Sequence, residues 1–309
     1  MISGEKILVT GVSGNVARPL ALSLAPDNEV WGIARFADAT PSSATRRQEL
    51  EDAGITTRAV DLGEGDLSEV PDDFTYVLHL AWTRADLSEL EASLRTNVEG
   101  AGLVLQHCHR AKAALVMSGM GIYSPHPDPW HAYSEIDPIG RGATAYAPTS
   151  PASKLGLEAV ARFCARAFDL PVTITRLNTF MGVPESFPGM HINAVLAGQP
   201  IVAPCDPNPH SPIHVDDMAW QLEALLDAAS TTACVTNWCG DEVTTAQEWV
   251  AWASEWSGLP GTLEVREVPC SPTGSSADPT RRRSITGPCR TNFRESYRAL
   301  YESMTEGSG

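Results

Sequence analysis

The sequence predicts an α/β fold in which a doubly wound parallel sheet is followed by a small C-terminal α/β subdomain. Two observations predict it. Short apolar runs typical of strands alternate with helical patterns through about residue 180, and the first of these runs leads directly into a glycine-rich turn and a helix. Strands that alternate with helices form parallel βαβ units, whose ligands bind at the carboxyl edge of the sheet.

The first strand and its turn occupy residues 6–17, which read Lys-Ile-Leu-Val-Thr-Gly-Val-Ser-Gly-Asn-Val-Ala. Gly11 permits the sharp bend, Gly14 lets the backbone approach a pyrophosphate, and the small Ala17 lets the helix pack on the strand. The amides at the helix N-terminus meet the phosphate charge. The turn therefore predicts a Rossmann dinucleotide site, whose expected contacts here are Gly11, Ser13, Gly14, Asn15 and Val16.

The second strand, residues 29–34, ends where many NAD sites place an acidic residue for the adenosine ribose. Here that position is Ala34, and Arg35 follows it. Because no carboxylate repels a 2′-phosphate and a guanidinium is available to pair with it, the sequence favours NADP over NAD.

Three more strands are expected at residues 57–62, 75–81 and 113–118. A long helix is expected from Asp86 to about Arg110, and Asp86 is its expected N-cap because Glu89 stands at capping-box spacing. The strand ends are predicted to contact the cofactor, since they lie at the carboxyl edge of the sheet. The residues concerned are Asp61, Leu62, Leu80, Ala81 and Trp82.

An irregular segment rich in Pro, Gly, His and Tyr spans residues 119–145. Irregular connections at the carboxyl edge of such a sheet commonly carry the substrate chemistry. A helix from Pro151 to Phe168 and a strand at residues 172–178 are expected to follow, with Pro151 in the first turn of the helix.

The regular alternation ends near residue 180, so we expect a Rossmann domain at residues 1–180, with a contribution from about 210–240. Residues 181–309 are expected to form mostly a substrate-binding subdomain and a C-terminal tail. A helix is expected to open at Asp216 or Asp217, a strand to span residues 234–239, and a helix to begin at Thr245 with Glu248 at capping-box spacing. The tryptophans of this region are expected to form its core; they are Trp238, Trp249, Trp252 and Trp256.

Composition excludes several classes of partner. The formal net charge of −16 argues against a protein that wraps a nucleic acid, which needs clustered basic residues. The seven cysteines are widely spread without a CxxC pair, so we expect neither a disulfide framework nor a metal site. No segment has the pattern of a secretory signal or the length of a membrane helix, and we therefore expect a cytoplasmic protein with no membrane partner.

Eight short motifs occur in one order: Thr10-Gly-x-x-Gly14-x-x-Ala17, Asp61-Leu62, His79-Leu80-Ala81, Asn97-Val-x-Gly100, Ile122-Tyr123, Ser153-Lys154-x-x-x-Glu158, Arg176-Leu-Asn and His214-Val-Asp-Asp217. Together they resemble the extended short-chain dehydrogenase/reductase family, particularly its NAD-dependent epimerase/dehydratase branch, to about residue 260. The resemblance implies that the glycine turn and Asp61 bind NAD(P). It also implies that the strand ending in Leu80 lies against the cofactor, that Asn97 belongs to the cofactor site, and that Lys154 holds the nicotinamide ribose.

The catalytic positions depart from the family. Its tyrosine stands four residues before the lysine, and that position is Ser150 here. Its Ser or Thr stands four residues before the tyrosine of a V-Y-G segment, and that position is Gly119, with Ser118 beside it. The phenol that normally moves the substrate proton is therefore missing. The candidates for this task are Lys154, if burial depresses its pKa, together with Ser150, Tyr146, Tyr123 and Ser118.

The leading hypothesis is an NAD(P)-dependent oxidoreductase or epimerase that acts on a small hydroxylated or carbonyl substrate with an unconventional proton donor. One alternative is a lyase or aldolase-like enzyme that binds NADP without net redox chemistry. Another is a non-catalytic dinucleotide-sensing module. A nucleotide sugar, which Arg176 or Arg281 to Arg283 would meet, and a small uncharged or aromatic substrate near Trp82, Trp130 and Met181 both remain open. The resemblance further implies a homodimer that pairs through the helices at residues 87–110 and 151–168.

Overall fold

The computed structural model describes residues 2–36, 41–140, 142, 147–266, 272 and 274–306. The chain forms two compact units. Unit 1 comprises residues 1–119, 147–176 and 219–236, and unit 2 comprises residues 120–146, 177–218 and 237–309. Each unit is therefore assembled from segments that are far apart in the sequence.

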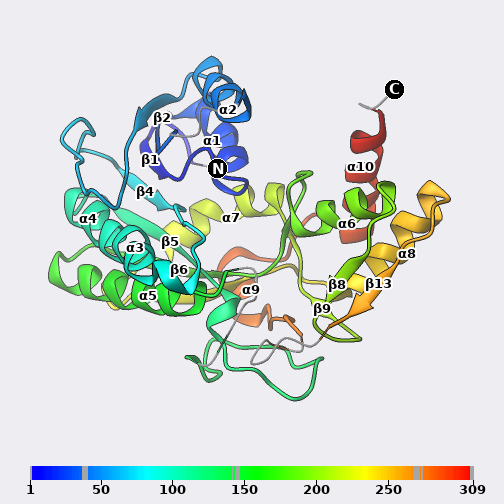
Figure 1. Ribbon diagram of the computed structural model, residues 1–309. Helices are drawn as coiled ribbons and strands as arrows, with labels where there is room; N and C mark the ends of the chain where they lie inside the picture. The colour runs from blue at the N-terminus through cyan, green and yellow to red at the C-terminus, as the bar shows by residue number, and fades with distance from the viewer. Residues whose placement is uncertain are drawn as a thin grey trace. The chain divides into compact units, whose positions relative to one another are not determined.

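A seven-stranded sheet with the order β11-β6-β5-β4-β1-β2-β3 organises unit 1 (Figure 1). Its strands are β1 (Lys6–Thr10), β2 (Glu29–Ala34), β3 (Thr56–Ala59), β4 (Tyr76–His79), β5 (Ala113–Gly119), β6 (Val172–Leu177) and β11 (Cys234–Trp238). β1 pairs in parallel with both β2 and β4, and the β2–β3 and β4–β5 pairs are also parallel. The predicted doubly wound parallel sheet is thus confirmed. Because the strand order reverses between β1 and β4, the carboxyl edge at this point is the natural place for a ligand.

The central strands are buried on both faces. Ile7, Leu8 and Val9 of β1 are each fully buried, one after another. Such continuous burial is typical of parallel strands covered by helices on both sides, whereas a sheet with one wet face would alternate. Unit 1 contains the helices α1 (Ala17–Leu24), η1 (Ala25–Asp27), α2 (Pro41–Asp52), α5 (Ser150–Ala167) and most of α7 (Val215–Asp227), besides the segment from Asp86 to Arg110.

The segment from Asp86 to Arg110 is a composite rather than the single helix expected. It contains η2 (Leu87–Glu89), α3 (Leu90–Leu94), the π-helical turn η3 (Arg95–Glu99) and α4 (Gly100–His107). The predicted capping box of Asp86 and Glu89 is present at its start. The wide turn surrounds Asn97, whose side chain forms hydrogen bonds with the backbone of Thr83. The prediction of a single helix rested on the spacing of apolar residues, and that spacing does not reveal such a tertiary contact. In Figure 1, α3, α4 and α5 lie together along one side of the strands.

Unit 2 consists of short strands and helices. They are η4 (Met120–Ile122), β7 (Phe180–Met181), α6 (Phe187–Leu196), β8 (Ile201–Ala203), β9 (Pro209–His210), β10 (Ile213–His214), β12 (Thr244–Thr245), α8 (Ala246–Ser257), β13 (Leu263–Val265), α9 (Thr280–Thr286) and α10 (Phe293–Glu306). The capping box of Thr245 and Glu248 is formed as predicted. Trp249 is fully buried in an apolar cluster against which Trp252 and Trp256 pack, so the predicted core role of these tryptophans is confirmed. Among the described helices, none combines the length and apolar character needed to cross a bilayer.

Candidate functional site

The glycine turn brings the end of β1 against the end of β4. Gly11 has a φ of +68°, and its amide donates to the Ile33 carbonyl of β2 at 2.7 Å. A Cβ placed on Gly11 would lie 2.6 Å from the Ala81 Cα, a distance that no side chain tolerates. The amide of Gly14 then donates back to the Gly11 carbonyl at 2.8 Å. The structure therefore joins two predicted site residues, Gly11 and Ala81, and requires glycine at the first.

A threonine hydroxyl holds this junction. Thr10 Oγ1 accepts hydrogen bonds from the amides of Leu80 at 3.2 Å and Ala81 at 3.1 Å. Its single proton is therefore directed to His79 Nδ1, 3.1 Å away. His79 must then carry its own proton on Nε2, and burial, assisted by the charge of Lys154, lowers its pKa to about 3. The prediction of site residues omitted Thr10 and His79, although both stand in the quoted motifs, because apolar strand patterns do not show which hydroxyl bridges two strands.

The turn fits the expected dinucleotide. The Oδ1 atom of Asn15 is buried and has no hydrogen-bond partner in the described ranges. An unpartnered acceptor next to a turn that excludes side chains suits a ligand with hydroxyl donors, such as a ribose. Arg46 donates to the Ser13 carbonyl at 3.1 Å, so its guanidinium lies beside the same turn. Val16 is buried under it.

The other predicted cofactor residues lie at neighbouring strand ends. Arg35 follows β2, is exposed, and donates to Thr83 Oγ1 at 3.2 Å. Asp61 follows β3 by two residues and accepts from the Gly63 amide at 2.8 Å, while Leu62 is buried. All of these residues belong to unit 1.

Asn97 positions the loop after β4. Its Oδ1 accepts from the Thr83 amide at 2.7 Å, and its Nδ2 donates to the Thr83 carbonyl at 2.9 Å and to Ser93 Oγ at 3.1 Å. The side-chain amide is thus fully used by the protein. These bonds fix the segment after β4 that carries Ala81 and Trp82, and the place of Asn97 in a cofactor site stays a prediction.

Lys154 is the central charged group of this edge. It lies in the first turns of α5, is only 7% exposed, and its Nζ donates to the Met117 carbonyl of β5 at 2.7 Å. The same atom stands over the Trp82 ring, 5.3 Å from the centroid. Burial lowers the pKa of Lys154 to about 7, and the carboxylate of Glu158 opposes this effect. A substantial fraction of the amine is therefore neutral near pH 7.

The neighbouring carboxylate does not form an ion pair with this lysine. Arg176 of β6 donates to both oxygens of Glu158, Nε to Oε1 at 2.9 Å and NH2 to Oε2 at 2.9 Å. Both side chains are at most 5% exposed. This bidentate pair is the strong form of an arginine–carboxylate contact, and it leaves Glu158 with limited charge to offer Lys154.

Two further polar groups at this edge lack partners. The buried Trp82 Nε1 and Ser118 Oγ each find no hydrogen-bond partner in the part of the chain that the structure describes. Ser118 is 2% exposed and follows Met117, whose carbonyl holds Lys154. Trp82 after β4, Ser118 of β5 and Lys154 of α5 therefore lie at one edge of the sheet, and their roles there stay predictions.

The remaining candidates for proton transfer fall in different places. Ser150 is half-buried in the first turn of α5, one helical turn before Lys154. Tyr146 lies outside the described residues. Tyr123 belongs to unit 2, where it is fully buried, stacks on Tyr133 at 5.1 Å, and donates its hydroxyl to Asn237 Oδ1 at 2.7 Å. This contact gives Tyr123 a packing role, and its part in proton transfer stays a prediction.

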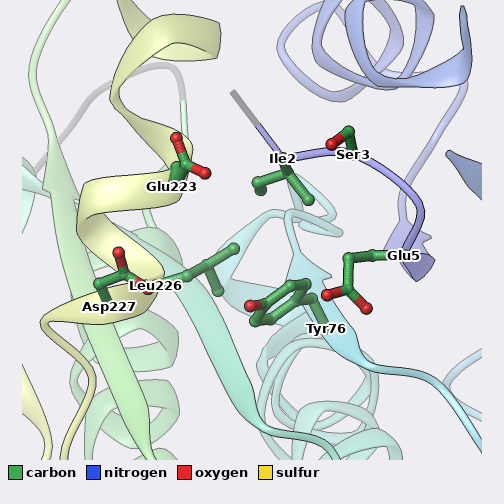
Figure 2. A pocket seen from close by; sticks show the side chains of 7 residues that line it. All are labelled: Ile2, Ser3, Glu5, Tyr76, Glu223, Leu226 and Asp227. Carbon is green, nitrogen blue, oxygen red and sulfur yellow. The ribbon is translucent and has the colours of Figure 1, made fainter. Parts of the chain in front are cut away.

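A separate hollow of about 130 Å³ lies at the amino edge of the sheet (Figure 2). Glu5 precedes β1, Tyr76 begins β4, and Glu223 and Asp227 come from α7. Burial raises the pKa of Tyr76, and these three carboxylates add to the effect. An acidic hollow repels the phosphates of a dinucleotide, and it stands at the edge of the sheet opposite to Lys154.

Comparison with known proteins shows the family of the chain. The profile of the NAD-dependent epimerase/dehydratase family matches residues 7–233, which confirms the resemblance drawn from the motifs. No curated protein matches the chain.

Solved structures of the same fold cover nearly the whole chain. UDP-glucuronic acid 4-epimerase from Bacillus cereus, in complex with UDP-glucuronic acid and NAD, is 21% identical, covers 97% of this chain and 99% of its own, and has a TM-score of 0.83. UDP-N-acetylglucosamine 4-epimerase from Methanobrevibacter ruminantium is 18% identical over 99% of this chain and 100% of its own, with a TM-score of 0.81. dTDP-glucose 4,6-dehydratase from Bacillus anthracis, in complex with NAD, is 15% identical over 98% of this chain and 97% of its own, with a TM-score of 0.78. At these identities the likeness shows the fold.

Replacing Gly11 with alanine will disrupt this edge. We expect Gly11→Ala to lower the free energy of unfolding by about 2–4 kcal/mol and to abolish dinucleotide binding, because the methyl group meets the Ala81 backbone. Gly54→Ala is the matched control: Gly54 also has a positive φ, +85°, but a Cβ there meets nothing within 4 Å, so we expect a cost of only about 1–2 kcal/mol. Urea denaturation followed by circular dichroism and a fluorescence titration with NADPH measure the two effects. Equal costs for the two variants would contradict the proposed close contact.

Proposed function

Because the chain belongs to the NAD-dependent epimerase/dehydratase family, we propose that it is a dinucleotide-dependent oxidoreductase or epimerase in which Lys154 itself moves the substrate proton. One observation carries this proposal. Lys154 is only 7% exposed, its Nζ is held at the Met117 carbonyl and burial lowers its pKa to about 7, while Ser150 stands at the position of the family tyrosine. A general base works best when its pKa lies near the operating pH, and this lysine meets that requirement.

The cofactor-binding residues of the proposal are those at the carboxyl edge of unit 1. The Gly11–Gly14 turn would accommodate the pyrophosphate, Asn15 and Asp61 would accept from hydroxyl or amino groups, and Lys154 would face the nicotinamide half. A bound nicotinamide supplies a hydride acceptor or donor. The protein supplies the fixed turn, the apolar surroundings of the lysine and the proton transfer at Nζ.

The direction of proton transfer follows from the pKa of Lys154. Above pH 7 the amine is mostly neutral and accepts the proton of a substrate hydroxyl during alcohol oxidation. Below pH 7 it is mostly an ammonium and donates a proton during carbonyl reduction. Ser118, whose buried hydroxyl has no partner among the described residues, would position the substrate oxygen beside the amine.

The substrate class is proposed from the names of the similar structures. They are described as epimerases of UDP-glucuronic acid and UDP-N-acetylglucosamine and as a dTDP-glucose dehydratase. Nucleotide sugars are therefore the first substrates to test. Small secondary alcohols and ketones are the second set, because they need no basic residues for a diphosphate.

We further propose NADP as the preferred cofactor. Ala34 ends β2 without a carboxylate, exposed Arg35 follows it, and Arg46 is held at the Ser13 carbonyl. Two guanidinium groups beside the expected ribose suit a 2′-phosphate. Two of the similar structures named above contain NAD, so NAD is the competing outcome.

A homodimer through α4 and α5 is also proposed. These helices pack closely, since a Cβ on Gly102 would lie 2.9 Å from a Val160 methyl. Their outer surface carries exposed large apolar side chains: Phe163 is 64% exposed and Leu103 is 40% exposed. Covering such a surface with a second copy removes apolar area from water.

Turnover tests the proton role of Lys154. The purified protein is assayed with nucleotide sugars and, together with NADP(H), with alcohols and ketones. We expect the rate of alcohol oxidation to rise as the pH increases through about 7, and the rate of carbonyl reduction to fall. Lys154→Met should lower kcat by about 100-fold or more, because the proton acceptor is lost. Lys112→Met is the control, since Lys112 is an exposed lysine bonded to Glu5, and it should leave kcat unchanged. Dinucleotide binding without any turnover would favour the sensing module, and full activity in Lys154→Met would refute the role of the lysine.

Arg35 tests the cofactor preference. Arg35→Ala should weaken NADPH binding by about 10- to 100-fold, because a charge-assisted contact to the 2′-phosphate is lost, while NADH binding changes less than about twofold. The control Arg162→Ala removes an exposed arginine of α5 and should change neither affinity. Isothermal titration with both cofactors measures this. If the wild-type protein binds NADH more tightly than NADPH, NAD is the cofactor and the proposed preference is wrong.

Phe163 tests the dimer. Phe163→Glu should raise the dimer dissociation constant by at least about 10-fold, because a charge would be buried in an apolar contact. Val243→Glu, which alters a 45% exposed residue of unit 2, should leave the association unchanged. Sedimentation velocity over a micromolar concentration series distinguishes the two. A wild-type monomer throughout that series would contradict the proposal.

A further inference from the structure

The Lys154 amine is bounded by groups from several elements of unit 1. The Met117 carbonyl of β5 accepts its hydrogen bond, and the ring of Trp82, three residues after β4, lies 5.3 Å from Nζ. On its own helix, Glu158 is bonded on both oxygens to Arg176 of β6. His79 of β4 is neutral, because burial lowers its pKa to about 3. The face of Trp82 and the Met117 carbonyl are therefore the direct contacts of the amine, while the Glu158 carboxylate favours its charged form without a hydrogen bond to it.

We propose that Trp82 is a positioning residue for Lys154: its ring face holds the amine at the end of β5 and stabilises the ammonium form. The proton-transfer role this serves rests on the function proposed above, whereas the contact itself does not. An ammonium within about 6 Å of an indole centroid is attracted by the negative face of the ring, and the attraction grows when water is excluded. A neutral amine gains far less from the same ring, so the contact favours the ammonium form of Lys154 over the neutral amine.

The location of Trp82 supports this assignment. The loop that carries it is anchored on both sides, by the Thr10 hydroxyl at Ala81 and by the Asn97 amide at Thr83. The indole Nε1 itself has no hydrogen-bond partner among the residues that the structure describes. The backbone therefore places the ring at Lys154, and within the described ranges a substitution of Trp82 breaks no hydrogen bond of the indole N–H. Trp82→Phe therefore keeps an aromatic ring face and removes the indole N–H, which has no hydrogen-bond partner among the described residues.

The sequence permits a direct measurement without substrate. The chain contains three lysines, Lys6, Lys112 and Lys154. Full-length protein labelled with ¹³C at lysine Cε should therefore give three resolved signals, and loss of one signal in Lys154→Arg assigns it. Titration of each signal with pH then yields the pKa of Lys154, while Lys6 and Lys112 report whether the fold is intact.

We expect Trp82→Leu to lower the pKa of Lys154 by about 0.4 to 1.5, because the ammonium form loses the ring face. Trp82→Phe should lower it by less than half of that amount. In the pH profile of alcohol oxidation, the rise in rate should move to lower pH by the same interval in each variant, with a smaller change in KM.

Other outcomes overturn the inference. If the Lys154 pKa in Trp82→Leu is unchanged or higher while the signals of Lys6 and Lys112 stay in place, Trp82 does not stabilise the ammonium. If Trp82→Leu does not fold, Trp82→Phe decides: a fall of up to about 0.7 in the Lys154 pKa supports the ring contact, and an unchanged or higher pKa refutes it. A wild-type Lys154 that titrates near 10.5 would refute its proposed proton role, whereas the difference between wild type and Trp82→Leu would still test the ring contact.

Discussion

The site depends on the close approach of the β1 turn to the end of β4. The Thr10 hydroxyl accepts both amides that follow β4, and Gly11 packs against Ala81 with no room for a Cβ. These contacts fix the backbone after β4. Because Trp82 directly follows Ala81, they also fix the position of its backbone. The same junction therefore shapes the dinucleotide turn and places an aromatic ring over Lys154.

Burial of an amine is the second feature that defines this edge. A buried cation is costly unless it is paired, and Glu158, the nearest carboxylate along α5, is bonded to Arg176. Lys154 therefore has a carbonyl and a ring as its direct contacts, and burial lowers its pKa to about 7 although the Glu158 charge opposes this effect. Groups whose pKa is strongly perturbed cluster at functional sites, which supports the proton role proposed for this lysine.

Much of the fold was predictable because its signals are local. The glycine turn, the capping boxes of Asp86 and Thr245, and the buried strands can all be recognised within short windows. The π-helical turn at Asn97 was not predictable, since the bond of this side chain to Thr83 is a tertiary contact that a local pattern does not contain. The roles of Thr10 and His79 were missed for the same reason. Conversely, the motif made Tyr123 a candidate for proton transfer. Only the tertiary structure shows that its hydroxyl donates a hydrogen bond to Asn237.

By itself, the sequence determined the parallel α/β fold, the family and the identity of the altered positions Ser150 and Gly119, because these follow from residue types at fixed spacings. The tertiary structure decided the electrostatic state of Lys154. That state depends on which groups surround the amine, and residues far apart in the sequence, Trp82, Met117 and Arg176, are brought around it or its neighbour Glu158 only by folding. A pKa reflects the local environment of a group, and spacing along the chain does not contain that information.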